Sequence, residues 1–81
     1  MTTQHLKELI EAGHDIQLKY HDKTYWITWS EVLGDNLVYF YEANAGDEVG
    51  FKDADELIAG SYHNLKIKEI WESLSEEDLD Y

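Results

Sequence analysis

Residues 16–29 read IQLKYHDKTYWITW, two runs in which large apolar and polar side chains alternate. Alternation with a period of two is typical of β-strands that bury one face. A two-residue turn at Asp22 and Lys23 would join the runs into a hairpin. Because Lys23 is not ideal in such a turn, a longer turn remains open. The pairs predicted on the buried face are all large and apolar: Tyr20 with Tyr25, Leu18 with Ile27, and Ile16 with Trp29.

Two further strands are predicted after the hairpin, over residues 37–43 and 48–52. The residues between them, 44–47, read NAGD, which is typical turn chemistry. A four-residue loop there would place Phe40 opposite Phe51 and Glu42 opposite Val49. A short turn at Gly34 and Asp35 would independently place Phe40 beside Trp29.

The loop at 44–47 and the turn at Gly34 and Asp35 both direct the same side chains of the third strand inward. Val38 and Phe40 then enter the core, and Tyr39 and Tyr41 point outward on the same side as Trp26. A three-residue turn over 34–36 would reverse this assignment, because a slip of one residue exchanges the two faces of a strand.

Three helices are predicted around these strands. The first covers residues 3–12, and the second runs from Asp53 through Ala59, where Asp53 and Glu56 match the D-x-x-E capping pattern. The third begins after a cap at Asn64 and covers 65–74, with a core stripe of i, i+3, i+4 and i+7 spacing. The predicted order is α-β-β-β-β-α-α. The fold class is α+β, a two-layer domain over residues 1–74 with a four-stranded antiparallel meander and helices on one face, followed by an acidic C-terminal tail, 75–81.

Three segments of this pattern are familiar. They are the hairpin Ile16-x-Leu18-x-Tyr20-x-x-x-x-Tyr25-x-Ile27, the capped segment Phe51-Lys52-Asp53-x-x-Glu56-Leu57, and the helix Leu65-Lys66-x-Lys68-Glu69-Ile70-Trp71. Together they resemble small acidic domains of Gram-positive bacteria and their phages and mobile elements. Those domains largely have no assigned function, so the resemblance implies an architecture and no active site.

Composition excludes several classes of function. The 81 residues carry 18 acidic and 6 basic side chains, a net charge of −12, and contain neither Arg nor Cys. A pI near 4.4 disfavours nucleic acid and anionic membrane surfaces as ligands. The absence of Cys excludes disulfides and thiol chemistry. The first residues lack the pattern of a signal peptide, so the expected location is the cytoplasm.

No catalytic or metal-binding constellation is visible. The four His residues do not follow the i, i+4 spacing of a helical metal site: His5, His14, His21 and His63. The acidic run at 53–56 lacks the later ligands and the glycine of a calcium loop. No serine lies in a G-x-S-x-G context. We therefore expect no enzyme activity, no cofactor and no bound metal.

The informative feature is the predicted outward group of Trp26, Tyr39 and Tyr41, rimmed by Lys19 and His21. Contiguous outward aromatics often mark an interaction surface, although they also stabilise a sheet by covering one another across strands. The leading hypothesis is a non-enzymatic module for protein–protein interaction, with a protein partner or a second copy of the chain.

The alternative hypothesis starts from the uneven charge. Residues 42–81 carry twelve acidic and three Lys residues, a net charge of −9. Such a segment could imitate nucleic acid and inhibit a basic nucleic-acid-binding protein. The predicted acidic patch consists of Asp47, Glu48, Asp53, Asp55, Glu56, Glu76, Glu77 and Asp78.

Overall fold

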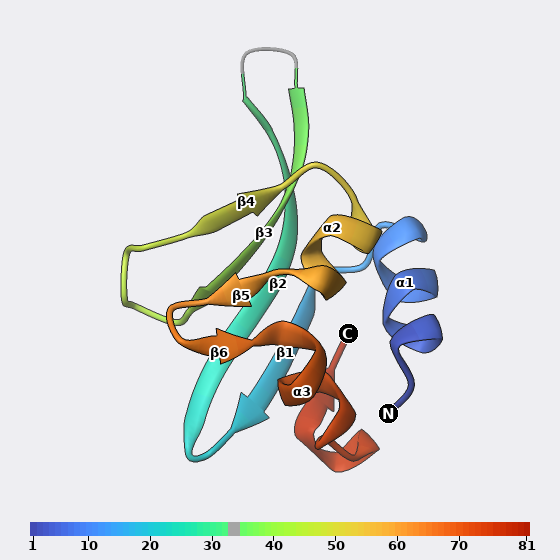
Figure 1. Ribbon diagram of the computed structural model, residues 1–81, viewed down its shortest axis with the longest axis vertical. Coiled ribbons are helices and arrows are strands. Elements are labelled where there is room, and N and C mark those ends of the chain that lie inside the picture. The colour runs from blue at the N-terminus through green and yellow to red at the C-terminus, as the bar shows by residue number, and fades with distance from the viewer. Residues whose placement is uncertain (33–34) are drawn as a thin grey trace.

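The computed structural model (Figure 1) describes residues 1–32 and 35–81, with the side chains of residues 1–30 and 37–81. Its main feature is a five-stranded antiparallel sheet of order β4-β3-β2-β1-β7, with a separate hairpin of β5 and β6. The elements are α1 (Thr3–Glu11), β1 (Ile16–Tyr20), β2 (Lys23–Val32), β3 (Asp35–Glu42), β4 (Val49–Phe51), α2 (Ala54–Ala59), β5 (Ser61–Tyr62), β6 (Leu65–Lys66), α3 (Ile67–Glu72), the 3₁₀ helix η1 (Glu76–Asp78) and β7 (Leu79–Asp80). The predicted α+β class and antiparallel sheet are confirmed, whereas the four-strand count and the element order are wrong.

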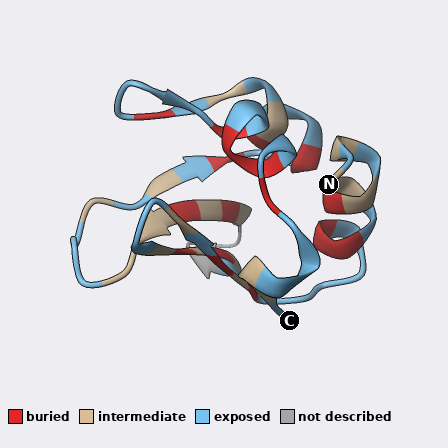
Figure 2. Cartoon of the chain, turned by 90° about the horizontal axis from the view of Figure 1, so that it is seen from below, coloured by how far each residue is buried: buried red, intermediate tan, exposed pale blue. Residues whose placement is uncertain are grey.

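One core joins the helices to the sheet. Buried side chains of all three helices belong to the same cluster as the inward residues of β1, β2 and β3. Figure 2 shows these buried positions on the facing sides of the helices and the sheet. Trp71 of α3 is fully buried, and its indole N–H donates to the Thr2 carbonyl at 2.7 Å. That bond connects the last helix to the start of the first.

The first hairpin turns at His21 and Asp22, so the predicted turn at Asp22 and Lys23 is wrong. Both residues have positive φ, 51° and 64°, as a two-residue hairpin turn of type I′ requires. Asp and His enter this left-handed region more readily than most residues, which explains why the turn avoids Lys23. The register shifts by two positions: Tyr20 pairs with Lys23, Leu18 with Tyr25, and Ile16 with Ile27.

The other two registers shift by two positions as well. Phe40 pairs with Ile27 instead of Trp29, and Val49 pairs with Phe40 instead of Glu42. The predicted turn residue Gly34 lies outside the described residues, and Asp35 pairs with Val32 as the first residue of β3. A shift of two preserves which face each side chain occupies. Val38 and Phe40 are therefore fully buried, as predicted, and the three-residue turn that would have reversed the faces is wrong.

Trp29 occupies a different place from the predicted one. It pairs with Val38 beyond the end of β1, so it does not face Ile16, and it is 36% exposed. Its indole N–H donates to the Ile10 carbonyl at 2.7 Å, near the C-terminal end of α1. Trp29 thus bridges sheet and helix at the margin of the core.

The second half of the chain departs further from the prediction. The Asp53 side chain accepts from the Glu56 N–H at 2.9 Å and α2 ends at Ala59, as predicted. Asn64, however, is no helix cap. His63 and Asn64 form the turn between β5 and β6, where His63 has a φ of 54°. The third helix begins two residues later than predicted, at Ile67.

Residues 75–81 are not the free tail that we predicted. Both the N–H and the hydroxyl of Ser75 donate to the Asp78 carboxylate, at 3.0 and 3.2 Å. Leu79 then pairs with Leu18 and Asp80 with Gln17, which adds β7 to the edge of β1. The side chains of β7 alternate as those of β1 do: Leu79 packs against the core, whereas Asp80 is exposed.

The observed turn predicts opposite effects for glycine at adjacent positions. Asp22→Gly should leave the free energy of unfolding unchanged or raise it by up to about 1 kcal/mol, because glycine adopts positive φ without strain. Lys23→Gly should lower it by about 1 kcal/mol, because Lys23 lies in β2 and pairs with the Glu42 carboxylate at 3.5 Å. Urea unfolding followed by tryptophan fluorescence measures both. A stabilising Lys23→Gly would instead support the turn at residues 22–23.

Candidate interaction surface

The sheet face that points away from the helices is here called the outer face. Its described side chains and its one glycine are Gln17, Lys19, Thr24, Trp26, Thr28, Ser30, Leu37, Tyr39, Tyr41, Gly50 and Asp80. The pairing arranges them in rows across the strands. One row runs Asp80, Gln17, Trp26, Tyr41, and the next runs Thr28, Tyr39, Gly50. The structure thus brings Trp26, Tyr39 and Tyr41 together on adjacent strands.

The aromatic side chains of the outer face are each partly buried. Tyr39 illustrates why: a Cβ atom at Gly50 would lie 3.0 Å from the Tyr39 Cε1 atom and 3.4 Å from Leu37 Cδ1. Glycine at position 50 therefore allows the Tyr39 ring to lie close against β4. The aromatic rings both pack on their own sheet and leave surface that a partner can contact.

The two predicted rim residues are placed differently. Lys19 is exposed on the outer face, as the alternation predicts. His21 lies in the turn beyond the end of β1, where its ring is 4.1 Å from that of Tyr20 between centroids. His21 therefore lies at the tip of the hairpin, beyond the outer face, although it lines a common hollow with Lys19 and Thr24.

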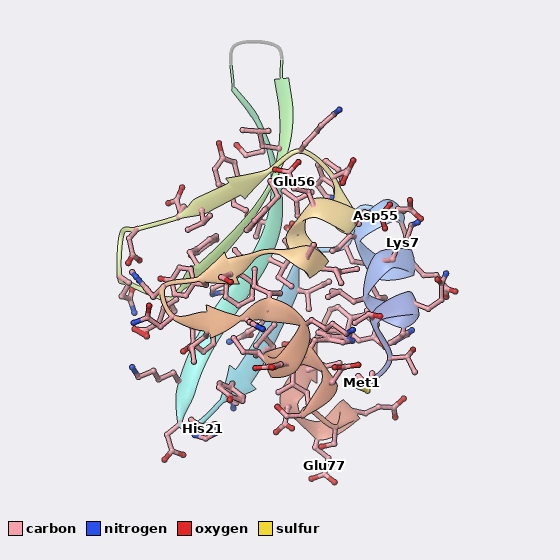
Figure 3. All side chains as sticks on the ribbon, in the orientation of Figure 1. Met1, Lys7, His21, Asp55, Glu56 and Glu77 are labelled. Atoms are coloured by element: carbon pink, nitrogen blue, oxygen red, sulfur yellow. The ribbon has the colours of Figure 1, made fainter. Side chains whose placement is uncertain are left out.

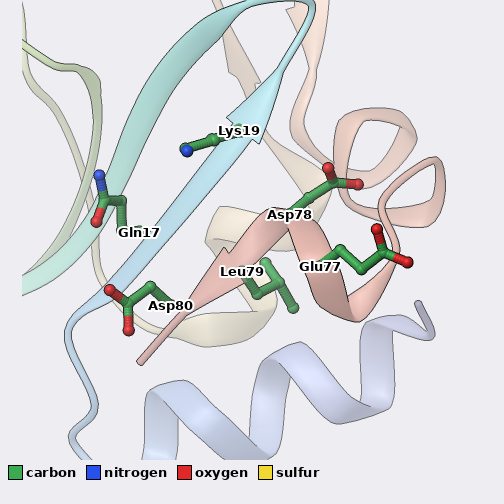
Figure 4. A pocket seen from close by; sticks show the side chains of 6 residues that line it. All are labelled: Gln17, Lys19, Glu77, Asp78, Leu79 and Asp80. Atoms are coloured by element: carbon green, nitrogen blue, oxygen red, sulfur yellow. The ribbon is translucent and has the colours of Figure 1, made fainter.

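Open hollows follow the edge of the sheet where β1 and β7 meet. We define the edge hollow by its lining residues, which are Asp15, Gln17, Trp26, Asp80 and Tyr81. The adjacent acidic hollow is lined by Gln17, Lys19, Glu77, Asp78, Leu79 and Asp80. Figure 4 shows Gln17 and Asp80 at one end of the acidic hollow and Glu77 and Asp78 at the other. Sequence reasoning missed both hollows because it treated residues 75–81 as a tail.

The predicted acidic patch is divided among separate parts of the molecule. Figure 3 shows Asp55 and Glu56 around α2, well above Glu77 at the lower end of the molecule. Several of the carboxylates also have partners inside the protein. Asp55 pairs with Lys7 at 3.2 Å, Asp53 caps α2, and Asp78 accepts from Ser75. The eight acidic residues do not form one continuous surface.

A polar cluster that the sequence did not indicate joins the connection after β3 to the β5–β6 hairpin. The Tyr62 hydroxyl donates to Asp47 Oδ1 at 2.6 Å and accepts from the Glu42 N–H at 3.1 Å. The imidazole Nε2 atom of His63 lies 2.5 Å from Asp47 Oδ2. The Tyr62 ring itself is buried against Tyr25 and Phe40. We call this arrangement the Tyr62 clip.

The clip shifts the ionisation of its members. The hydrogen bond from Tyr62 lowers the pKa of the Asp47 carboxyl, and the bond to His63 acts in the same direction. Burial raises the pKa of Tyr62, and its bond to Asp47 adds to that shift. The Tyr62 hydroxyl both donates and accepts a hydrogen bond within the protein, so the cluster joins the two segments.

Among the described side chains, those of residues 1–30 and 37–81, no group of three or more His, Asp or Glu is arranged to hold a metal ion. No helix in the same ranges has the length and apolar character needed to cross a membrane.

The chain matches no protein-family model, no curated protein and no solved structure. The resemblance to small acidic domains of Gram-positive bacteria and their phages therefore stays a prediction.

The Tyr62 clip predicts a coupled loss of stability. Tyr62→Phe should lower the free energy of unfolding by about 1 kcal/mol, because the Glu42 N–H and the Asp47 carboxylate each lose a partner. Tyr20→Phe is the matched control, since the Tyr20 hydroxyl makes no hydrogen bond within the described part of the chain. Asp47→Asn should have a smaller effect in the Tyr62→Phe background than alone, as a double-mutant cycle would show.

The same clip predicts a pH dependence. Because the pKa of Asp47 is lower in the folded state than in the unfolded state, its contribution is present above the unfolded pKa and is lost as pH falls through the folded pKa. The stability difference between wild type and Asp47→Asn, measured by urea unfolding at a series of pH values, should therefore shrink on acidification. A difference that stays constant down to the acid limit would contradict the assignment.

Proposed function

We propose that the protein is a small non-enzymatic module that binds another protein through the outer face. The observation that carries the proposal is the cross-strand group of Trp26, Tyr39 and Tyr41 on the one sheet face that no helix covers. Trp and Tyr are the residues most often found at the energetic centres of interfaces. In this proposal the protein acts in the cytoplasm.

The charge of the chain favours a foreign partner over a second copy. A two-fold symmetric dimer on the outer face would place the same patch of each chain against its counterpart. Each chain carries a net charge of −12, so two copies repel each other as they approach. Like charges placed together in an interface are unfavourable. A basic protein surface would meet no such repulsion.

Site-specific photo-crosslinking tests the face. A benzoylphenylalanine at position 28, on the outer face, should capture a partner from an extract of the cells that make the protein. The same group at position 68, an exposed position on α3, should not. Trp26→Ala combined with Tyr39→Ala should reduce capture roughly ten-fold or more, because each truncation of such a residue removes about 1–2 kcal/mol of binding free energy.

The matched control for that pair is Leu65→Ala. Leu65 is an exposed apolar residue on β6, 37% exposed and outside the sheet. Its truncation should leave capture unchanged. Two results would refute the outer face as the binding surface. One is capture from position 68 only, and the other is capture at position 28 that does not change with the Trp26 and Tyr39 substitutions.

The net charge of −12 predicts that the protein is a monomer in solution. Light scattering coupled to size-exclusion chromatography should give a mass near 9.5 kDa at every concentration tested. Low salt should not promote association, because it strengthens repulsion between acidic chains. A stable dimer that dissociates on Trp26→Ala would show instead that the outer face is occupied by a second copy.

A further inference from the structure

We infer that the edge hollow accepts the arginine side chain of a basic segment in the partner protein. The inference rests on the proposed function and names the chemistry of the partner. The residues that line the hollow are Asp15, Gln17, Trp26, Asp80 and Tyr81, and they combine aromatic side chains with two carboxylates. An arginine side chain complements such a lining, because its guanidinium stacks on aromatic faces and pairs with carboxylates.

Tertiary contacts build this hollow from three parts of the chain. Gln17 pairs with Trp26 on one side and with Asp80 on the other, so the three side chains lie in one row across β2, β1 and β7. Beyond this row, the Tyr81 ring packs against His5 and His14, with centroid distances of 6.3 and 5.8 Å. The pairing of β7 with β1 therefore positions Asp80, and the chain end after it is held by the packing of Tyr81 on His5 and His14.

The carboxylates of the edge hollow have no cation of their own. Among the described side chains, the ion pairs involve Asp55, Glu42 and Asp47, and none involves Asp15 or Asp80. A ligand cation would meet two unpaired carboxylates beside an indole ring. An anionic ligand would be repelled, and an apolar ligand would remove water from both carboxylates without compensation.

The neighbouring acidic hollow extends the site along β7. It shares Gln17 and Asp80 with the edge hollow and adds Glu77 and Asp78 (Figure 4). Lys19 is the single basic residue in its lining. Together the two hollows contain four carboxylates, those of Asp15, Glu77, Asp78 and Asp80, and one ammonium group, that of Lys19. This excess of negative charge favours an extended segment with several basic residues, and charge complementarity of this kind accelerates association.

Nuclear magnetic resonance with a defined probe tests the inference. The probe is a capped peptide in which arginine alternates with glycine, compared with the same peptide carrying glutamine in place of arginine. The arginine peptide should shift the indole N–H signal of Trp26 and the side-chain amide signals of Gln17. The indole signals of Trp71 and Trp29 should stay in place, because both groups are bonded to backbone carbonyls. High salt should weaken the binding.

Charge and ring substitutions then locate the contact. Asp80→Asn and Asp15→Asn should each raise the Kd of the arginine peptide by up to about five-fold, as expected for exposed ion pairs. Trp26→Ile should raise it roughly two- to five-fold through loss of the cation–π contact. Glu56→Gln is the matched control: it removes one exposed carboxylate that lies on α2, away from Glu77, and should leave the Kd unchanged (Figure 3).

Four results would overturn the inference. They are an arginine peptide that leaves Trp26 unmoved, a glutamine peptide that moves it equally, a Glu56→Gln effect as large as that of Asp80→Asn, and Trp26 shifts that appear on concentrating the protein alone. The last would assign the hollow to a second copy. If capture at position 28 depends on Trp26 while the arginine peptide does not bind, the proposed function stands and only the basic partner is refuted. If that capture fails, the proposed function itself is lost.

Discussion

The alternation of side chains along β2 is the constraint on which the rest of the molecule depends. β2 is the central strand, and its inward residues Tyr25 and Ile27 are buried while Trp26 and Thr28 point the other way. Every neighbouring strand must present its apolar side chains to the same face, because a slip of one residue would bury polar groups and expose the core. All three registers differ from the expected ones by two positions, which is the smallest shift that satisfies this constraint. The helices then gather on one face, and Trp26, Tyr39 and Tyr41 on the outer face have no helix over them.

Contacts between distant segments determine which residues lie along the edges of this sheet. At one edge, the pairing of β7 with β1 brings Asp80 beside Gln17 and completes the edge hollow. Behind the opposite half of the sheet, the Tyr62 clip joins the connection after β3 to the β5–β6 hairpin. The first contact builds a surface that faces solvent, whereas the second secures a buried ring. The same chain thus places acidic side chains both around a solvent-facing hollow and in internal hydrogen bonds.

The distribution of charge indicates which kind of partner would fit the proposed function. A net charge of −12 does not by itself identify a partner, because most acidic side chains of a soluble surface are simply hydrated. In this protein several carboxylates are bonded internally, as at Asp53, Asp55 and Asp78, and the predicted acidic patch is dispersed. The carboxylates that adjoin the outer face differ because they border an indole ring in a hollow. Aromatic surface next to unpaired negative charge is the combination that a basic protein segment fits best.

The amino-acid sequence by itself determined the α+β class, the inward positions of Val38 and Phe40, the outward position of Trp26 and the cap at Asp53, because alternation and capping are local properties of a short segment. It did not determine the strand registers, since parity allows shifts of two; between β1 and β2, for example, the turn geometry at His21 and Asp22 selects the register. The β5–β6 hairpin, the pairing of β7, the Tyr62 clip and the edge hollow were decided by the tertiary structure alone. The pairing of β7, the Tyr62 clip and the edge hollow join residues that are far apart in the chain. The β5–β6 hairpin is local, but strands of two residues such as Ser61–Tyr62 and Leu79–Asp80 have too little local preference to show where they pair.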